Sequence, residues 1–204
     1  MFDIYYTVWY NVAGEKMNTD EKIMEKALEA FALNGYENIG VQEICDISGI
    51  TKPTLYHYFG SKNGLLTHIM ATYSKRLIQD ISVASEYHGD LPLTINKTVK
   101  TYFSFAHHHR AFYRLLLNLY FAPPQSQFSI IAHHYMKEQY LILEKLFFLA
   151  SQDHGNMKRR ETRYAITLLG FINSYIGMWM NEEVDLNDDL IFSASHQFMH
   201  GIYS

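Results

Sequence analysis

The sequence predicts an all-α protein of about nine helices, on three observations. Apolar residues recur at helical spacing, as in the series Ile23, Ala27 and Phe31. Proline stands only at positions 53, 92, 123 and 124, each in a first turn or in a loop between helical stretches. The alternation of apolar and polar residues that is typical of β-strands does not occur.

Capping residues and glycines divide the chain into its helices. Asn18 or Thr19 begins the first helix, and Gly35 ends it because glycine adopts the backbone conformation that follows a helix. Thr51 and Ser61 cap the third and fourth helices. We expect helices at residues 19–34, 41–48, 52–59, 61–86, 91–108, 110–121, 125–152, 158–182 and 187–202.

The composition excludes several classes of protein. The chain has 204 residues, enough for one or two domains, and its 15% of aromatic residues exclude disorder as the main state. Cys45 is the only cysteine, so no disulfide forms within the chain, and with no secretory signature the sequence fits a reducing cytoplasm. A net charge of −4 excludes a surface that is basic everywhere, but it permits a local basic patch.

An uncharged run from Tyr164 to Asn181 is the one candidate for a membrane span. The run includes Thr167, Asn173, Ser174 and two glycines, which favour a helix that is buried in protein. We therefore expect no contact with a membrane. The alternative, a small membrane-associated helical protein, would sediment with membranes.

Residues 1–16 form an extra N-terminal segment with five aromatic side chains and no helical period. The segment lacks the basic start and the aliphatic stretch of a signal peptide. One interpretation places the natural start at Met17, so that the preceding residues are not part of the native protein. The other retains Met1 and treats the segment as an aromatic arm that reaches DNA or a second subunit.

The two short helices at 41–48 and 52–59 form a candidate helix-turn-helix motif. Gly49 supplies the turn between them, because its backbone adopts a positive φ without strain. We expect Leu55, Tyr58 and Phe59 to face the neighbouring helices. Lys52, Thr54, Tyr56 and His57 are then left on the outer side or at the N-terminal end of the second helix.

These outward residues suit recognition of double-stranded DNA. Lysine donates to the guanine edge in the major groove, and the threonine methyl group and the proline ring contact thymine methyl groups. No acidic residue occurs between Asp46 and Asp80, whereas that stretch contains four basic residues, Lys52, Lys62, Lys75 and Arg76. A local positive charge therefore surrounds the candidate recognition helix.

The same residues resemble the N-terminal signature of the TetR family of transcriptional regulators. The similarity covers about residues 19–75 and rests on Gly35-Tyr36, VQEIC at 41–45, SGITKPTLYHYF at 48–59, Ser61-Lys62 and Leu65-Leu66. It implies a helix-turn-helix DNA-binding domain at 17–65 and a larger helical ligand-binding and dimerisation domain at 66–204. The implied DNA contacts are Gln42, Thr51, Lys52, Pro53, Thr54, Tyr56, His57 and Lys62, with Tyr56, His57 and Lys62 as phosphate anchors.

Two departures from the family pattern weaken the expected DNA contacts. Ile39 and Gly40 stand where the family usually has a capping threonine or serine, so a hydroxyl that binds phosphate is missing. Gln42 stands where the family often has arginine, so this position can donate a hydrogen bond but carries no charge.

The C-terminal part has a core that is rich in tyrosine and methionine. Such a core either packs solidly or encloses a mainly apolar ligand with a few hydroxyl groups. The family resemblance favours a ligand, an unidentified small-molecule effector. The candidate pocket residues are Tyr102, Phe105, Tyr113, Leu116, Tyr120, His134, Tyr140 and Tyr175.

Small residues on the eighth predicted helix indicate a close approach of another helix. Gly170, Ser174 and Gly177 share one stripe, and Phe198 lies on the matching face of the last helix. The family resemblance implies that these last two helices form a homodimer with two-fold symmetry. The alternative is a monomeric bundle that uses the stripe for internal packing.

No residues predict a metal, a cofactor or a catalytic site. The consecutive histidines at 107–109 and 133–134 point in different directions on a helix, so they do not chelate together. Phosphate-binding loops, nucleophile elbows and paired catalytic carboxylates do not occur. The sequence therefore predicts a cytoplasmic, non-enzymatic regulator, a repressor that a ligand releases from a palindromic operator. The alternative is a ligand-independent DNA-binding or assembly protein with a solid C-terminal core.

Overall fold

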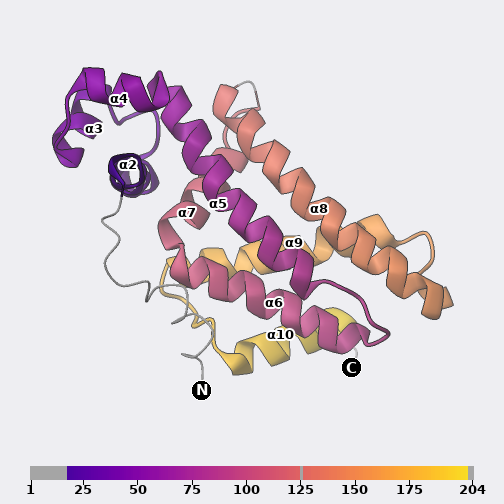
Figure 1. Ribbon diagram of the computed structural model, residues 1–204. Coiled ribbons are helices and arrows are strands. Elements are labelled where there is room, and N and C mark those ends of the chain that lie inside the picture. Colours follow the sequence, from indigo (N-terminus) through magenta and orange to yellow (C-terminus); the bar gives the residue numbers. More distant parts are fainter. Residues whose placement is uncertain (1–17, 125, 202–204) are drawn as a thin grey trace.

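The computed structural model describes residues 18–124 and 126–201 (Figure 1). The segment 1–16 and both candidate start residues, Met1 and Met17, lie outside these described residues, so their interpretation stays open.

The described residues form nine α-helices and one short 3₁₀ helix, and they contain no strand. The predicted all-α class is therefore confirmed. The elements are α2 (Thr19–Asn34), α3 (Val41–Ser48), α4 (Lys52–Phe59), α5 (Lys62–Ala84), α6 (Leu91–His108), α7 (Arg110–Tyr120), α8 (Gln127–Asp153), η1 (Gly155–Met157), α9 (Glu161–Met180) and α10 (Asp188–His200).

Local hydrogen bonds explain where the N-terminal helices begin. The Glu21 side chain accepts a hydrogen bond from the backbone N–H of Asn18 at 3.2 Å, which satisfies a donor ahead of α2. The Ser61 hydroxyl accepts from the backbone N–H of Gly64 at 2.9 Å and so caps α5. Because Ser61 caps α5, only residues 60 and 61 lie between α4 and α5.

Helix α9 shows the largest difference between an expected and an observed start. The sequence predicts a helix from residue 158, whereas α9 begins at Glu161. Arg159 has a φ of 66°, a left-handed conformation that an α-helix does not contain. The short 3₁₀ helix η1 therefore ends before α9 can begin.

The helices form two groups that α5 connects (Figure 1). Helices α2, α3 and α4 gather at one end of the molecule, and α5 runs from this end to the opposite side. Helix α8 packs along α5, and α9 packs against α8. Helices α6 and α10 lie together at the other end.

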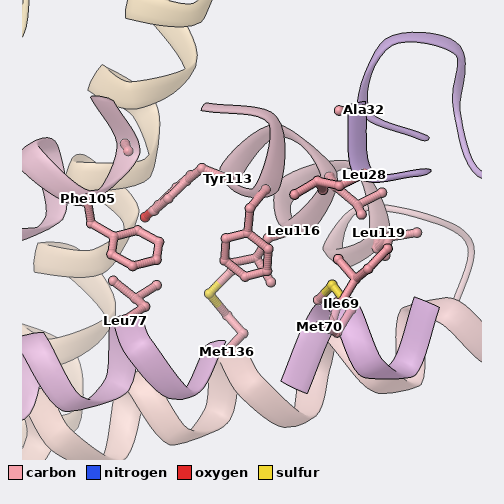
Figure 2. Close-up of a cluster of buried hydrophobic side chains, with 14 of the residues drawn as sticks. Leu28, Ala32, Ile69, Met70, Leu77, Phe105, Tyr113, Leu116, Leu119 and Met136 are labelled. Carbon is pink, nitrogen blue, oxygen red and sulfur yellow. The ribbon is translucent and has the colours of Figure 1, made fainter. Parts of the chain in front are cut away.

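One continuous apolar core joins the two groups. Leu28 and Ala32 of α2 lie beside Leu116 and Leu119 of α7, over the α5 side chains that include Ile69 (Figure 2). The predicted boundary between residues 65 and 66 falls inside α5, where both leucines are fully buried. The apolar packing is continuous across this boundary. The division into two domains at residue 65 stays a prediction.

Within the part of the chain that the structure describes, every helix is too short or too polar to cross a membrane. The uncharged run at 164–181 lies almost entirely in α9, whose inward side chains are buried against the rest of the protein.

Candidate nucleic-acid interface and effector region

Helices α3 and α4 form a helix-turn-helix arrangement. Gly49 adopts the left-handed conformation, with φ 66° and ψ 35°, and its N–H bonds to carbonyls of the last turn of α3. Ile44 and Cys45 of α3 and Leu55 and Phe59 of α4 are buried in the core. The opposite side of α4 is consequently presented to solvent.

The residues predicted to contact DNA gather at this exposed side. Lys52 and Pro53 are exposed in the first turn of α4, and Thr51 precedes them as its cap. Tyr56 is 46% exposed, His57 is exposed on the same short helix, and Thr54 is half-buried. These side chains form one continuous surface at the N-terminal end and the outer face of α4. We call it the α4 face.

Two further predicted residues, Tyr58 on α4 and Gln42 on α3, are also exposed. Tyr58 is 42% exposed, so the expectation that it faces the neighbouring helices is wrong. Leu55 and Phe59 alone are buried on this helix, because eight residues leave room for one inward stripe. Gln42 is exposed on α3, and its amide donates to Asp46 Oδ1 at 2.8 Å.

Lys62 lies apart from the α4 face and is tied to the protein itself. Its ammonium donates to the backbone carbonyl oxygen of Tyr36 at 2.5 Å and lies 4.1 Å from the centre of the Tyr36 ring. Loss of hydration lowers the pKa of the Lys62 ammonium, an effect that nearby Glu37 opposes. Lys62 is half-buried, and its role as a phosphate anchor stays a prediction.

The turn between α4 and α5 requires a glycine at position 64. A Cβ atom at this position would lie 1.8 Å from the carbonyl oxygen of Phe59, far inside contact distance. Gly64 therefore lets the first turn of α5 approach the end of α4 closely. This approach fixes the direction in which α4 leaves the core.

An open groove of about 720 Å³ lies between α7, α8 and α9. Of the predicted pocket residues, Tyr120 and Tyr140 line it. Burial raises the pKa of Tyr140 to about 12, and a hydrogen bond with Tyr120 adds to the shift. The full lining is Leu117, Asn118, Tyr120, Phe121, Tyr140, Gly170, Asn173, Ser174, Gly177 and Met178.

Four predicted pocket residues lie in the packed core and do not line the groove. Tyr102, Phe105, Tyr113 and Leu116 are all at most 1% exposed. The Tyr113 hydroxyl donates to Oδ1 of Asn173, which lines the groove, whereas the Tyr102 hydroxyl is buried with no hydrogen-bond partner among the described residues. Tyr113 therefore connects to the groove wall from inside, through Asn173.

Two further pocket predictions have different outcomes. Tyr175 is half-buried and packs edge-on against Phe171, at 5.4 Å between ring centres. His134 is exposed on the outer side of α8, with Nε2 3.5 Å from a Glu138 carboxylate oxygen. Its assignment to the pocket is wrong, because residue 134 lies on the opposite side of the helix from the buried residue Met136.

The residues predicted for a dimer interface divide between two surfaces. Gly170 and Ser174 are exposed and Gly177 is partly exposed, and all three form one wall of the groove. Phe198 turns inward instead, with its ring centre 6.0 Å from that of Phe147 and 6.1 Å from that of Phe171. The exposed aromatic residue of α10 is Phe192, at 67%. Phe198 is half-buried, and its place in a dimer interface stays a prediction.

The histidines at 107–109 contact different partners. The His107 ring lies 5.5 Å from that of Trp179, His108 bonds to the carbonyl of Ser104, and His109 packs on Phe105 at 4.5 Å. Residues 18–124 and 126–201 contain no group of three or more side chains placed to hold a metal ion.

Sequence reasoning missed the amides of the groove, Asn118 and Asn173. Asn173 lies next to Ser174 on the predicted stripe, which was the available signal. Asn118 gave no signal, because a lone polar residue near the end of an apolar helix is usually solvated.

Comparison with known proteins places these features in context. The family model described as "Bacterial regulatory proteins, tetR family" matches residues 23–69. The transcriptional activator FasR of Mycolicibacterium smegmatis is 26% identical over 195 residues, which cover 94% of this chain and 87% of FasR.

Solved structures share the fold over nearly the whole chain. The regulator FadR from Bacillus subtilis, in complex with stearoyl-CoA, matches with a TM-score of 0.75 and 19% identity, covering 89% of this chain and 98% of FadR. AibR in complex with isovaleryl coenzyme A and operator DNA matches with a TM-score of 0.70 and 21% identity, covering 89% of this chain and 96% of AibR. At this level of identity, the likeness establishes the arrangement of helices.

Proposed function

Because the chain belongs to the TetR family of transcriptional regulators, we propose that it binds operator DNA through the α4 face under the control of a small ligand in its C-terminal part. The observation that carries this proposal is the α4 face itself. Lys52, Tyr56 and His57 are exposed on a short helix that a tight turn projects from the core. A recognition helix enters the major groove in this way, with its N-terminal residues at the base edges.

The residues of the α4 face divide into base contacts and phosphate contacts. Lys52, Pro53 and Thr54 in the first turn reach base edges, where lysine donates to guanine and the two apolar groups contact thymine methyl groups. Tyr56 and His57, one turn further, donate to phosphates on either side. Gln42 and Thr51 add uncharged contacts at the entrance to the groove.

Dimerisation would present two such helices to the DNA. We propose a homodimer formed by α9 and α10, whose outward faces carry Ile166 and Phe192 as exposed apolar side chains. A two-fold axis then places two recognition helices about 34 Å apart, or a multiple of this distance, on a pseudo-palindromic operator.

The groove between α7, α8 and α9 is the proposed entrance for the effector. Its wall combines apolar side chains with the Asn118 and Asn173 amides, and the buried Tyr102 hydroxyl of the same C-terminal part lacks a partner among the described residues. A buried hydroxyl without a partner costs free energy that a ligand acceptor would recover. FadR and AibR are described with bound acyl-coenzyme A thioesters, so we propose an acyl thioester as the ligand class.

Ligand binding would release the operator, so that the protein acts as a cytoplasmic repressor without a chemical step. The ligand must bind the DNA-incompetent state more tightly for this to occur. Activation is the second candidate, because FasR is named as an activator and its match covers 94% of this chain. A reporter gene behind the operator separates them: deletion of the regulator raises expression under repression and lowers it under activation.

Fluorescence anisotropy on DNA from upstream of the protein's own gene tests the DNA-binding proposal. We expect preference over scrambled DNA at two salt concentrations, and loss of that preference in Lys52→Ala. Lys75→Ala is the matched control, because it removes the same charge from an exposed site on α5. Equal losses in both variants would show that binding is electrostatic and does not read sequence.

A thermal shift with stearoyl-CoA and isovaleryl-CoA tests the ligand. A ligand that binds only the folded state raises stability by RT ln(1 + [L]/Kd). We expect a rise with at least one of the two acyl thioesters and a parallel fall in operator affinity. Unchanged melting with both, beside intact operator binding, would favour the ligand-independent alternative with a solid core.

A further inference from the structure

The first turn of α8 contacts the DNA-binding part of the protein, far from α8 in sequence. The ring of Phe128 lies 4.2 Å, centre to centre, from the ring of Tyr36 in the segment between α2 and α3. The amide of Asn63 on α5 donates to Oε1 of Gln127 at 3.2 Å. Two adjacent residues of α8 thus contact the segment between α2 and α3 and the first turn of α5.

These contacts continue into the side chains that support the DNA-binding part. The Tyr36 hydroxyl donates to Oδ1 of Asn63 at 2.5 Å, and the Lys62 ammonium donates to the Tyr36 carbonyl oxygen, also at 2.5 Å. We call the five residues Tyr36, Lys62, Asn63, Gln127 and Phe128 the α8 corner. Tyr36 is at its centre, only 6% exposed although it lies outside any helix.

The α8 corner adjoins the turn that directs α4. Lys62 and Asn63 are the first two residues of α5, directly after the capping residue Ser61. Gly64, the next residue, lies against the end of α4, at the carbonyl of Phe59. A shift of Lys62 and Asn63 therefore alters the direction in which α4 is held.

The same helix reaches the groove. Tyr140 lines the groove and lies 13 residues after Gln127 on the uninterrupted helix α8, a separation of about 20 Å at 1.5 Å per residue. A rigid helix carries a small displacement over this distance. The Asn63–Gln127 hydrogen bond is exposed, so water competes for it and it is readily exchanged.

We propose that Gln127 and Phe128 are positioning residues for the DNA-binding part, and that α8 couples the groove to α4 through the α8 corner. This inference rests on the proposed function, because it specifies how an occupied groove would alter operator affinity. In this proposal the first turn of α8 has two positions. It is either docked on Tyr36 and Asn63 or withdrawn from them.

Operator affinity of four variants tests the α8 corner. Gln127→Ala removes the exposed hydrogen bond. Phe128→Leu removes the aromatic ring but retains an apolar side chain, and Phe128→Ala removes the ring and most of the apolar contact. Phe148→Ala is the control, because Phe148 is 55% exposed on the same helix and belongs to no contact of the corner. We expect operator Kd to change at least fivefold in Phe128→Ala, less in the milder variants, and not in the control.

A double-mutant cycle separates positioning from general destabilisation. Gln127→Ala removes only one exposed hydrogen bond, so it should change the melting temperature by no more than a few degrees, whereas Asn63→Ala removes that bond and also the acceptor of the Tyr36 hydroxyl. We expect Gln127→Ala to have no further effect on operator Kd when it is added to Asn63→Ala, because the bond it would remove is already lost. Wild-type operator affinity in Gln127→Ala, Phe128→Leu and Phe128→Ala alike would overturn the proposal.

Hydrogen exchange provides a readout that does not depend on DNA. We expect Phe128→Leu and Gln127→Ala to speed amide exchange at residues 36–40 and 62–66, with Phe148→Ala unchanged. If wild-type protein failed to bind any operator, the proposed function would fail while this measurement still tested the corner. Unchanged exchange in both variants would show that α8 does not hold the N-terminal group.

Discussion

The hydroxyl of Tyr113 on α7 donates to Oδ1 of Asn173 on α9 across 2.7 Å. Tyr113 is fully buried, and desolvation raises the pKa of its hydroxyl well above the usual value. Asn173 reaches the groove at its other side. This single hydrogen bond connects the interior of the C-terminal part with the surface where we place the effector.

Tyr113→Phe should lower the free energy of unfolding by about 1 kcal/mol, the usual net contribution of such a bond. Asn173 remains partly accessible, so water replaces the lost donor and limits the effect. Urea denaturation measures the change. The double variant Tyr113→Phe/Asn173→Ala should be less destabilised than the two single changes added together. Strict additivity would contradict the coupling.

Gly64→Ala should abolish the native packing of α4 on α5. The new Cβ would lie 1.8 Å from the backbone oxygen of Phe59, which cannot move like a side chain. Gly170→Ala is the matched control, since Gly170 is also helical and its added Cβ would meet no atom beyond its own stretch of helix within 4 Å. We expect a melting temperature lowered by more than 10 °C for Gly64→Ala, and little change for Gly170→Ala. Comparable effects of both would contradict the steric argument.

His109 should make the protein sensitive to mild acid. Burial lowers the pKa of its imidazole to about 4 in the folded protein, with Arg76 and His108 adding to the shift. The unfolded chain therefore binds the proton first as the pH falls. The contribution to stability is complete above pH 6.5 and is lost between about 6.5 and 4.

Chemical denaturation at pH 7 and pH 5 measures this effect. His109→Gln should flatten the fall in unfolding free energy between the two pH values. His134→Gln serves as the control, because that side chain is exposed on α8. An identical pH dependence in the wild type and His109→Gln would show that other groups dominate.

Lys62 and Lys52 should differ in their effect on stability. Lys62→Ala removes a half-buried cation that bonds to the Tyr36 carbonyl, so we expect a melting temperature lower by several degrees. Lys52 is exposed at the start of α4, so Lys52→Ala should weaken DNA binding and leave melting nearly unchanged. Differential scanning fluorimetry compares the two. Equal melting temperatures would show that the bond between Lys62 and Tyr36 contributes nothing.

Phe192→Asp should convert the proposed dimer into a monomer. A charge at this exposed position of α10 would be buried without a partner in an α9–α10 interface. Light scattering should give about twice 23.9 kDa for the wild type and about that mass once for the variant. Leu33→Asp on α2, also strongly exposed, should leave the mass unchanged. A wild type that is monomeric at micromolar concentration would exclude the dimer.

The sequence predicted local structure well because local signals decide it. The cap residues Thr51 and Ser61, and the left-handed turn at Gly49, act on neighbouring backbone groups, so their positions fixed the ends of α3, α4 and α5. The exposed residues Lys52, Tyr56 and His57 of α4 could be predicted for the same reason, because Leu55 marks the inward side of this short helix.

The errors concern side chains whose direction depends on distant helices. Tyr58 and His134 occur in helices with apolar residues on more than one side, so periodicity alone could not select the inward face. The docking of Phe128 on Tyr36 joins residues 92 positions apart in the chain, and no spacing rule predicts such a pair. The groove likewise depends on how three helices cross.

The packing of Leu28 and Ala32 against α7 has a consequence for how the protein can be divided. A fragment that ends at residue 65 would carry the whole α4 face, yet it would turn this apolar surface of α2 towards water. The two ends of the molecule should therefore melt in a single cooperative transition. The C-terminal helices and α4 are thus parts of one thermodynamic unit, so destabilising either end lowers the folded population of both.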